Sequence, residues 1–448
     1  MPFDFTFSSP SEFEGPLPPA VDVAIIGGGI AGIMTAWFLA QQGQKILLCD
    51  KGRVAAEQSS RNWGWIRQQG RDIGELPIMI EALGHWQTLS RQIGPELGFR
   101  QSGILYTAKS SKDLERQEAW LKAAKGYDVD TRMLNPRAVA EQLDGCATSF
   151  AGGMMTPSDA SAEPWTAVPA IARVLARNPN VCLRERTAVR RLDVSAGRVA
   201  GIVTEAGRVK ADRVVLTGGA WSALFLAAHD VRIPQLSVRA TVAATRPMDM
   251  DLPVGATSEG TLAFRKRADG GFTLAPSFFH ELFIGPDAFR HLRPYLPMIW
   301  NDGVNTKYKL AAPAGYPDAW RTARAWPGDQ PSPFEAMRTL NPAPNSNKVR
   351  QMVHRFSELF PGAGDVQLQA SWAGMIDVMP DVVPILDHVP QLPGLTLATG
   401  LSGHGFGIGP GIGRVMADLT MGREVGHDLS PFAFDRFGKS RGTRTDLL

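Results

Sequence analysis

The sequence predicts an α/β protein (α+β overall), in which a nucleotide-binding domain is joined to a second domain built on a mainly antiparallel sheet. A strand, a glycine turn, a helix and a second strand follow one another over residues 21–50, which is typical of parallel α/β domains. Alternating apolar and polar residues at 238–245 and 261–265, followed by the turn Asp269-Gly270-Gly271, indicate antiparallel strands with a hairpin.

The composition is ordinary for a globular protein and argues against several classes. Of the 448 residues 44% are hydrophobic, and 47 Lys+Arg against 44 Asp+Glu give a net charge of +3. The sequence contains no block of Lys and Arg that would indicate a nucleic-acid partner. Cys49, Cys146 and Cys182 are too few and too scattered for a disulfide framework or a zinc site. We therefore expect no metal and a cytoplasmic location.

One uncharged segment is long enough to suggest a membrane span. Residues 23–40 carry no charge and just reach the length of a transmembrane helix. Four glycines fall in their first ten residues, and each costs about 1 kcal/mol relative to alanine inside a helix. The N-terminus also lacks the basic start and apolar core of a secretory signal. We expect no transmembrane segment.

The unit at residues 21–50 has the order of a dinucleotide-binding element. Residues 21–26 are a short β-branched run suited to a buried parallel strand. The pattern G-x-G-x-x-G follows, and apolar residues then recur at helical spacing up to Gly43. The second strand, 45–49, ends in Asp50. This order predicts a Rossmann-like domain.

Each part of this motif has a physical role. Gly27 allows the tight turn, Gly29 lets the backbone approach a pyrophosphate, and Gly32 permits close packing of helix on strand. The helix start at Ile30–Ala31 offers free N–H groups and a positive dipole end to the phosphates. Asp50 can accept hydrogen bonds from both ribose hydroxyls, and its charge would repel a 2′-phosphate.

A second glycine cluster lies near the C-terminus. Residues 395–399 indicate a strand, and a helical pattern spans 412–421. Because glycine loses much conformational entropy on ordering, we expect a loop whose backbone touches a flat ligand. The following helix start would stabilise negative charge on that ligand. The seven glycines are Gly400, Gly403, Gly405, Gly407, Gly409, Gly411 and Gly413.

Four motifs together resemble the flavoproteins of the D-amino-acid oxidase family, which includes glycine oxidase, sarcosine oxidase and amino-acid dehydrogenases. Besides the glycine cluster at 400–413, which resembles the family's G-H-x-x-G-F region, they are Ser59–Arg67, Gly218–Ser222 and Trp372–Pro384. Met379 stands where the family usually has a threonine. The resemblance covers most of the chain.

The resemblance implies FAD as the cofactor. Some members attach the flavin through a late cysteine or an early histidine, but no cysteine follows Cys182 and residues 59–69 contain no histidine, so we expect non-covalent binding. The motifs place the following residues at the cofactor: Gly27, Gly29, Ile30, Ala31, Gly32, Asp50, Lys51, Ser59, Ser60, Arg61, Asn62, Trp63, Gly64, Trp65, Val189, Gly218, Gly219, Trp221, Trp372, Gly374, Gly403, His404, Gly405, Phe406 and Gly407.

The resemblance also implies a reaction: a C–N bond of an amine or amino acid (a D-amino acid or an N-substituted amino acid) is oxidised by hydride transfer to flavin N5, and the imine hydrolyses. Arg67 and His404 are the catalytic candidates, Arg67 because similar members carry a flavin-facing arginine three residues after the glycine. Trp65, Arg265 and Tyr308 are the candidates for substrate binding.

Domain limits and alternatives follow from these motifs. The cofactor domain is expected at 20–75, 150–236 and 370–425, and the substrate domain at 76–149 and 237–369, with an arm at 1–19 and a tail at 426–448.

Electrons could pass to O2, or to a quinone or carrier in a dehydrogenase. A non-catalytic or assembly flavoprotein subunit is a further alternative. The sequence leaves the oligomeric state open.

Overall fold

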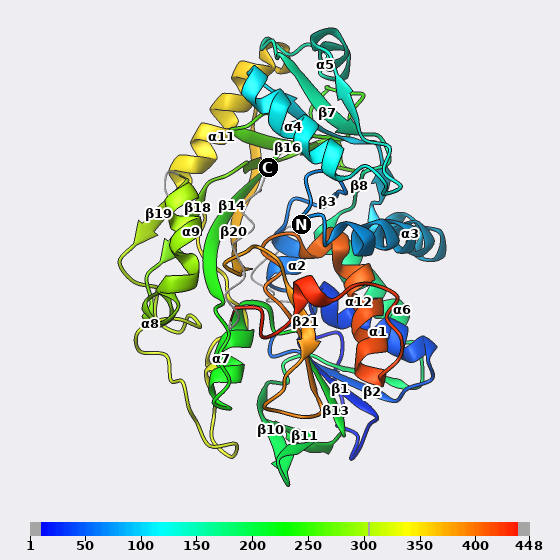
Figure 1. Cartoon of the computed structure of the whole chain (residues 1–448), viewed down its shortest axis with the longest axis vertical. Coiled ribbons are helices and arrows are strands. Elements are labelled where there is room, and N and C mark those ends of the chain that lie inside the picture. The colour runs from blue at the N-terminus through cyan, green and yellow to red at the C-terminus, as the bar shows by residue number, and fades with distance from the viewer. Residues whose placement is uncertain (1–9, 303–304, 438–448) are drawn as a thin grey trace.

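A six-stranded sheet organises the half of the molecule that contains the first glycine motif (Figure 1). The computed structural model describes residues 10–302 and 305–437. The strand order is β21-β22-β13-β1-β2-β9, and all neighbours are parallel except β21 and β22. The strands are β1 (Val23–Ile26), β2 (Ile46–Cys49), β9 (Val181–Arg184), β13 (Arg213–Leu216), β21 (Ile385–His388) and β22 (Leu395–Thr399).

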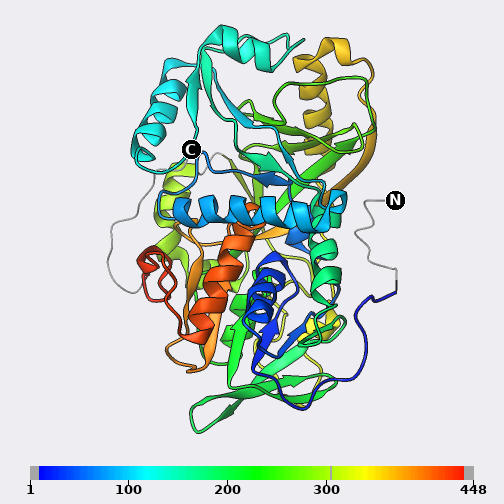
Figure 2. The same cartoon turned by 90° about the vertical axis from the view of Figure 1, so that its right-hand side faces the viewer.

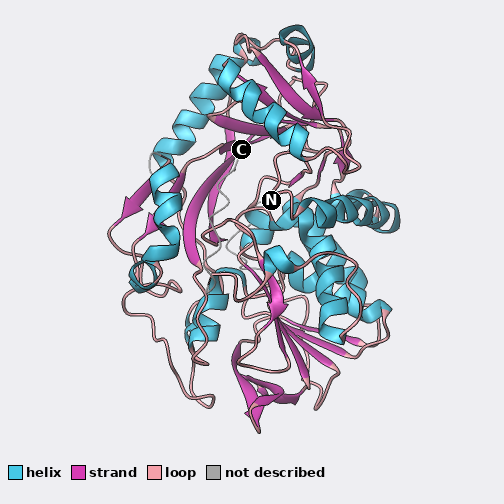
Figure 3. Cartoon of the chain, in the orientation of Figure 1, coloured by secondary structure: helices cyan, strands magenta, loops and turns pink. Residues whose placement is uncertain are grey.

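A ten-stranded sheet forms the other half, and Figure 3 shows its strands as a group separate from the parallel sheet. Only the pairs β15–β5 and β18–β19 are parallel, so the predicted fold class is confirmed. Its strands are β5 (Ile104–Ala108), β6 (Arg132–Leu134), β7 (Gly152–Thr156), β14 (Leu236–Thr245), β15 (Ala256–Ser258), β16 (Leu262–Lys266), β17 (Phe272–Pro276), β18 (His280–Phe283), β19 (Thr306–Lys309) and β20 (Leu368–Val378).

Helices cover both sheets. The core of the parallel half lies between its sheet and α1 (Ile30–Gln41), α3 (Leu76–Ile93), α6 (Pro164–Leu175) and α12 (Gly405–Met421). Figure 2 shows α3, in blue, lying across the middle of the molecule. The remaining α-helices are α2 (Gln58–Arg61), α4 (Ser111–Ala123), α5 (Pro136–Gln142), α7 (Ser222–Ala227), α8 (Pro286–Arg290), α9 (Leu292–Asp302), α10 (Pro333–Ala336) and α11 (Ser346–Leu359).

Two small sheets complete the described fold. One packs its apolar side on the parallel half and contains β10 (Val189–Ser195), β11 (Arg198–Thr204) and β12 (Gly207–Lys210). The other lies where the two halves meet and contains β3 (Trp65–Ile66), β4 (Arg100–Gln101) and β8 (Ala160–Ser161). No helix in the described part of the chain is both long and apolar enough to cross a membrane.

The second glycine cluster differs from the prediction. Only Gly400 and Gly403 lie in the loop with positive φ, at 73° and 82°. The other five glycines lie inside α12, which begins at Gly405 rather than near residue 412. A Cβ atom on Gly413 would lie 2.4 Å from Cβ of Met34, and one on Gly409 would lie 2.5 Å from Ile30. These glycines therefore let α12 approach α1 closely, and only the segment before Gly405 forms the loop that is expected to touch a ligand.

The packing also departs from the predicted domain limits. The first helix of the expected substrate segment, α3, packs in the core of the parallel half. Conversely β7 and β20, both expected in the cofactor domain, pair with β5 and β14 in the ten-stranded sheet. The chain therefore passes between the two halves at other points than the predicted limits.

The close packing of α12 gives a test with a matched control. We expect Gly413→Ala to lower the free energy of unfolding by about 1–3 kcal/mol, because the new methyl group meets the backbone and Cβ of Met34. Gly84→Ala, at an exposed site in α3 with no atom within 4 Å of the new methyl group, should instead gain up to about 1 kcal/mol. Urea unfolding of both FAD-loaded variants measures this difference, and equal effects would contradict it.

Candidate active site

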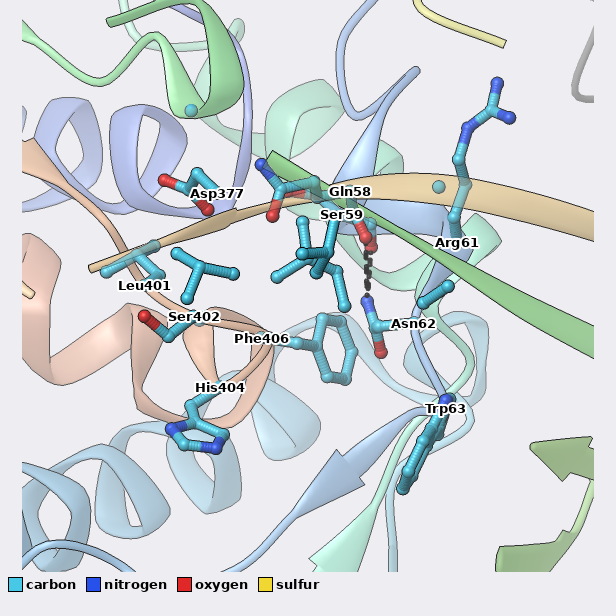
Figure 4. A pocket seen from close by; sticks show the side chains of 18 of the residues that line it. Gln58, Ser59, Arg61, Asn62, Trp63, Asp377, Leu401, Ser402, His404 and Phe406 are labelled. Atoms are coloured by element: carbon cyan, nitrogen blue, oxygen red, sulfur yellow. Dashed lines mark hydrogen bonds between the residues drawn. The ribbon is translucent and has the colours of Figure 1, made fainter. Parts of the chain in front are cut away.

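A cavity of about 1190 Å³ lies between the two halves. The carboxyl ends of β1, β2 and β13 line it on one side. On the other side Val238, Ala240 and Val242 line it, and these alternate residues of β14 share one face of the ten-stranded sheet. Figure 4 shows the middle of this cavity, with residues 58–63 facing residues 401–406.

Most of the predicted site residues lie on this cavity wall. They come from the first unit, from the segments after β2 and β13, from the start of β10, from β20 and from the start of α12, so the fold brings together six regions of the chain. The predicted residues that line the cavity are Gly27, Gly29, Ile30, Ala31, Asp50, Lys51, Ser59, Arg61, Asn62, Trp63, Trp65, Arg67, Val189, Gly218, Gly219, Trp221, Gly374, Gly403, His404, Gly405 and Phe406.

The end of the cavity beside α1 has the chemistry of a dinucleotide site. Asp50 accepts hydrogen bonds from the backbone N–H groups of Gly28, at 2.8 Å, and Gly52, at 2.7 Å. The hydroxyl of Ser59 accepts from the N–H of Ile30 at 2.9 Å and so meets the helix start. Burial raises the pKa of Asp50 to about 6, which hydrogen-bond donors such as ribose hydroxyls would lower.

Lys51 and Trp221 line one wall of this end together. The ammonium of Lys51 lies 4.3 Å from the centre of the Trp221 ring and 2.6 Å from Glu57 Oε1. The indole N–H of Trp221 donates to the same Glu57 carboxylate at 3.1 Å. This wall is therefore rigid, and Glu57 neutralises its positive charge.

The opposite end contains the start of α12. His404 lines the cavity, and its Nδ1 lies 4.0 Å from Glu75 Oε2. Burial and the nearby cations Arg71 and Arg67 lower the pKa of His404 well below its usual value, so the ring is neutral at pH 7. The positive end of the α12 dipole points into this region, which favours a ligand that gains negative charge.

Arg67 lies at the same end among aromatic side chains. Its Nη1 donates to the carbonyl of Gln69 at 2.5 Å, and its guanidinium carbon lies 5.8 Å from the centre of the Tyr106 ring. Trp63 and Trp65 contact each other edge to face, with ring centres 5.5 Å apart. The result is a cationic group in a largely aromatic part of the cavity.

The structure contradicts the prediction for Arg265. Its guanidinium is 1% exposed and forms a two-pronged ion pair with Glu163 at 3.0 and 2.9 Å, while its Nε donates to the carbonyl of Trp63. These bonds occupy the donors that a substrate carboxylate would need. Tyr308 is also outside the cavity wall, because it stands 43% exposed on the end strand β19.

Five predicted cofactor residues pack beside the cavity instead of lining it. A Cβ atom on Gly32 would meet the carbonyl of Gly27, so this glycine serves helix–strand packing. Trp372 is buried, and its indole N–H donates to the carbonyl of Arg61 at 3.0 Å. The other three are Ser60, Gly64 and Gly407, which is in contact with β3.

Several lining residues were missed by the sequence interpretation. Arg71 forms a buried ion pair with Glu75 at 3.2 Å, and the spacing of four residues was the only signal for it. Asp377 accepts from the N–H of Gly400 at 2.7 Å and from Gln235 at 3.1 Å, and burial raises its pKa. Gln58 and Tyr106 carried no signal in the sequence.

FAD fits the cavity on its own chemistry. The cavity volume and the glycine-lined helix start suit a long dinucleotide. Asp50 would supply the ribose acceptor at one end, and Nδ1 of His404 is a buried nitrogen without a hydrogen-bond partner at the other. Gly27–Ala31, Asp50 and Ser59 would hold the adenosine diphosphate part, and Gly403–Phe406 would face the flavin ring.

The raised pKa of Asp50 predicts a pH dependence of FAD binding. Because ribose hydroxyls bind the ionised carboxylate, the affinity for FAD should fall below about pH 6, by at most about tenfold per pH unit. Asp50→Asn should weaken binding about 10- to 100-fold at pH 8 and abolish this pH dependence. Fluorescence titration of the apoprotein with FAD measures both effects.

Asp22→Asn is the matched control for this experiment. Asp22 also accepts a backbone N–H, from Lys45 at 2.7 Å, but it precedes β1 at the opposite end of the strand. Its replacement should leave FAD affinity unchanged. An Asp50→Asn variant that retains the pH dependence would contradict the role of Asp50.

Comparison with known proteins agrees with this geometry. The family model described as FAD dependent oxidoreductase matches residues 22–419. A glycine oxidase of Pseudomonas aeruginosa is 24% identical over 92% of this chain and 98% of its own length. A D-amino acid dehydrogenase of Bradyrhizobium diazoefficiens is 22% identical over 94% of this chain and 100% of its own.

Solved structures resemble the whole chain. The L-amino acid deaminase from Proteus myxofaciens, in complex with anthranilate, is 28% identical with a TM-score of 0.90 and covers 96% of both chains. The L-amino acid deaminase from Proteus vulgaris is 26% identical with a TM-score of 0.89, over 95% of this chain and 99% of that one. The chain thus belongs to the family of FAD dependent oxidoreductases, with FAD as its cofactor.

Proposed function

We propose that this enzyme oxidises the Cα–N bond of an α-amino acid, with the L enantiomer as substrate. Bound FAD supplies the acceptor for the hydride of the substrate carbon. The imino acid then hydrolyses in water to a keto acid and ammonia. The observation that carries the proposal is the position of Arg67 on the cavity wall.

Arg67 is suited to bind the substrate carboxylate. Among residues 10–302 and 305–437 no Asp or Glu forms an ion pair with it, whereas Arg71 is paired with Glu75. One nitrogen of Arg67 is held by the carbonyl of Gln69, which fixes the direction of the fork. The remaining donors are available for a two-pronged bond to a carboxylate.

The surroundings favour the neutral form of the substrate amine. Only an uncharged amine releases hydride readily from its carbon. Arg67 is positive and has no carboxylate ion-pair partner among the described residues, His404 is neutral, and Trp63 and Trp65 line the cavity. Nearby cations and desolvation both lower the pKa of an ammonium group, so the site promotes loss of its proton.

The solved structures favour the L enantiomer of an amino acid, whereas the sequence resemblance implied a D-amino acid or an N-substituted amino acid and one relative is a D-amino acid dehydrogenase. The two solved structures named above, both of L-amino acid deaminases, resemble this chain over at least 95% of its length.

A cytoplasmic location is part of the proposal, since Cys49, Cys146 and Cys182 are all free thiols, and cell fractionation tests it.

Anaerobic bleaching of the flavin absorbance tests the substrate. L-amino acids should bleach the flavin, and their D enantiomers and simple amines should not. In Arg67→Met the KM for the amino acid should rise about 10- to 100-fold, because a charged hydrogen-bonded contact is lost. Arg91→Met, at an exposed arginine of α3, is the control and should leave KM unchanged. No bleaching by any amino acid would instead indicate a non-catalytic flavoprotein subunit.

The acceptor of the electrons is tested separately. After anaerobic reduction by the amino acid, the flavin is mixed with air-saturated buffer in a stopped-flow instrument. Reoxidation in milliseconds identifies an oxidase that uses O2. Reoxidation over minutes, accelerated by a soluble quinone, identifies a dehydrogenase of the same family.

A further inference from the structure

The segment Trp63-Gly64-Trp65 forms part of the cavity wall and is held from behind by the other half of the molecule. Trp63 and Trp65 both line the cavity. The carbonyl of Trp63 accepts a hydrogen bond of 2.7 Å from Nε of Arg265, which belongs to β16 of the ten-stranded sheet. Arg265 is therefore the link between this sheet and the wall of the site.

A buried acid fixes Arg265 in turn. Glu163, at the start of α6 in the parallel half, binds both terminal nitrogens of Arg265, and the two side chains are 7% and 1% exposed. Glu163 Oε1 also accepts from the backbone N–H of Ala268 at 2.8 Å. The guanidinium thus has one orientation, because all three of its nitrogens are bonded.

Gly64 shows how tightly the guanidinium is packed on this segment. A Cβ atom there would lie 3.0 Å from Nε of Arg265 and 2.3 Å from the carbonyl of Ala162. The carbonyl of Gly64 accepts from the N–H of Ala162 at 2.9 Å, and its φ is 79°. The segment is clamped between Ala162 and Arg265, so a shift of the guanidinium would shift both tryptophans.

We propose that Arg265 and Glu163 are positioning residues that hold Trp63 and Trp65 in place against bound FAD and substrate. Neither Glu163 nor Arg265 lines the cavity, so the two side chains act only through the carbonyl of Trp63 and the backbone of Gly64. The proposal depends on the FAD site and not on the identity of the amino acid.

Three variants separate positioning from simple stabilisation. Arg265→Met leaves Glu163 buried without its partner and should destabilise the fold strongly. The double variant Arg265→Met/Glu163→Met removes both charges and should regain thermal stability. Arg265→Lys keeps a positive charge but cannot bond Glu163 twice and Trp63 once.

If the pair positions the site, the double variant binds FAD but keeps a defect. Its kcat/KM should fall about a hundredfold, as expected for a displacement of about 1 Å, and the visible absorption and circular dichroism of the flavin should change. Arg265→Lys should show the same spectral change with a smaller loss of activity. Double and Lys variants with wild-type kcat/KM and flavin spectra would overturn the proposal.

Arg267→Met is the matched control. Arg267 is as deeply buried, two residues further along, and donates to Phe272, Thr245 and Gln369, which lie away from the cavity. Its replacement should lower the melting temperature and leave the flavin spectrum unchanged. A spectral change equal to that of Arg265→Lys would show that general loosening of the hairpin, not the Trp63 contact, is responsible.

Discussion

The close approach of α12 to α1 is the constraint on which the site depends. Side chains larger than hydrogen at Gly409 and Gly413 would collide with Ile30 and Met34, so the two helices can lie this near only because those positions are glycine. The approach places the start of α12 beside the first glycine motif. The pyrophosphate and the flavin ring of one FAD molecule would thereby each face a helix start, one from each end of the chain.

The arginines at the junction of the two halves are of two kinds, those paired with a buried carboxylate and those without such a partner. Arg71 and Arg265 are neutralised by Glu75 and Glu163, which makes their burial tolerable and fixes nearby backbone. Arg67 has no such ion pair in the described portion and faces the cavity. A positive group that the fold does not neutralise is available to a ligand, and this separates binding arginines from structural ones.

The sequence was sufficient to predict the first β-turn-α-β unit, but it was insufficient to predict which distant residues contact each other in the fold. The limits of β1, α1 and β2 could be predicted within two residues, because strand composition, the glycine turn and Asp50 act locally. The glycines at 405–413 were wrongly predicted to form a loop. Glycine permits a close contact between two helices as well as a bent backbone, and the sequence does not distinguish the two. The partner of Arg265 lies 102 residues away, a distance over which periodicity carries no information.

The parallel sheet has a consequence for how the protein reaches its native state. Strand β1 pairs with the nearby β2 and with the distant β13, and β13 in turn pairs with β22 near the C-terminus, so the sheet cannot be complete until most of the chain has been synthesised. Such long-range pairings slow folding. A dinucleotide that touches β1, β13 and α12 binds only the assembled state, so the supply of FAD in the cell shifts the folding equilibrium by mass action.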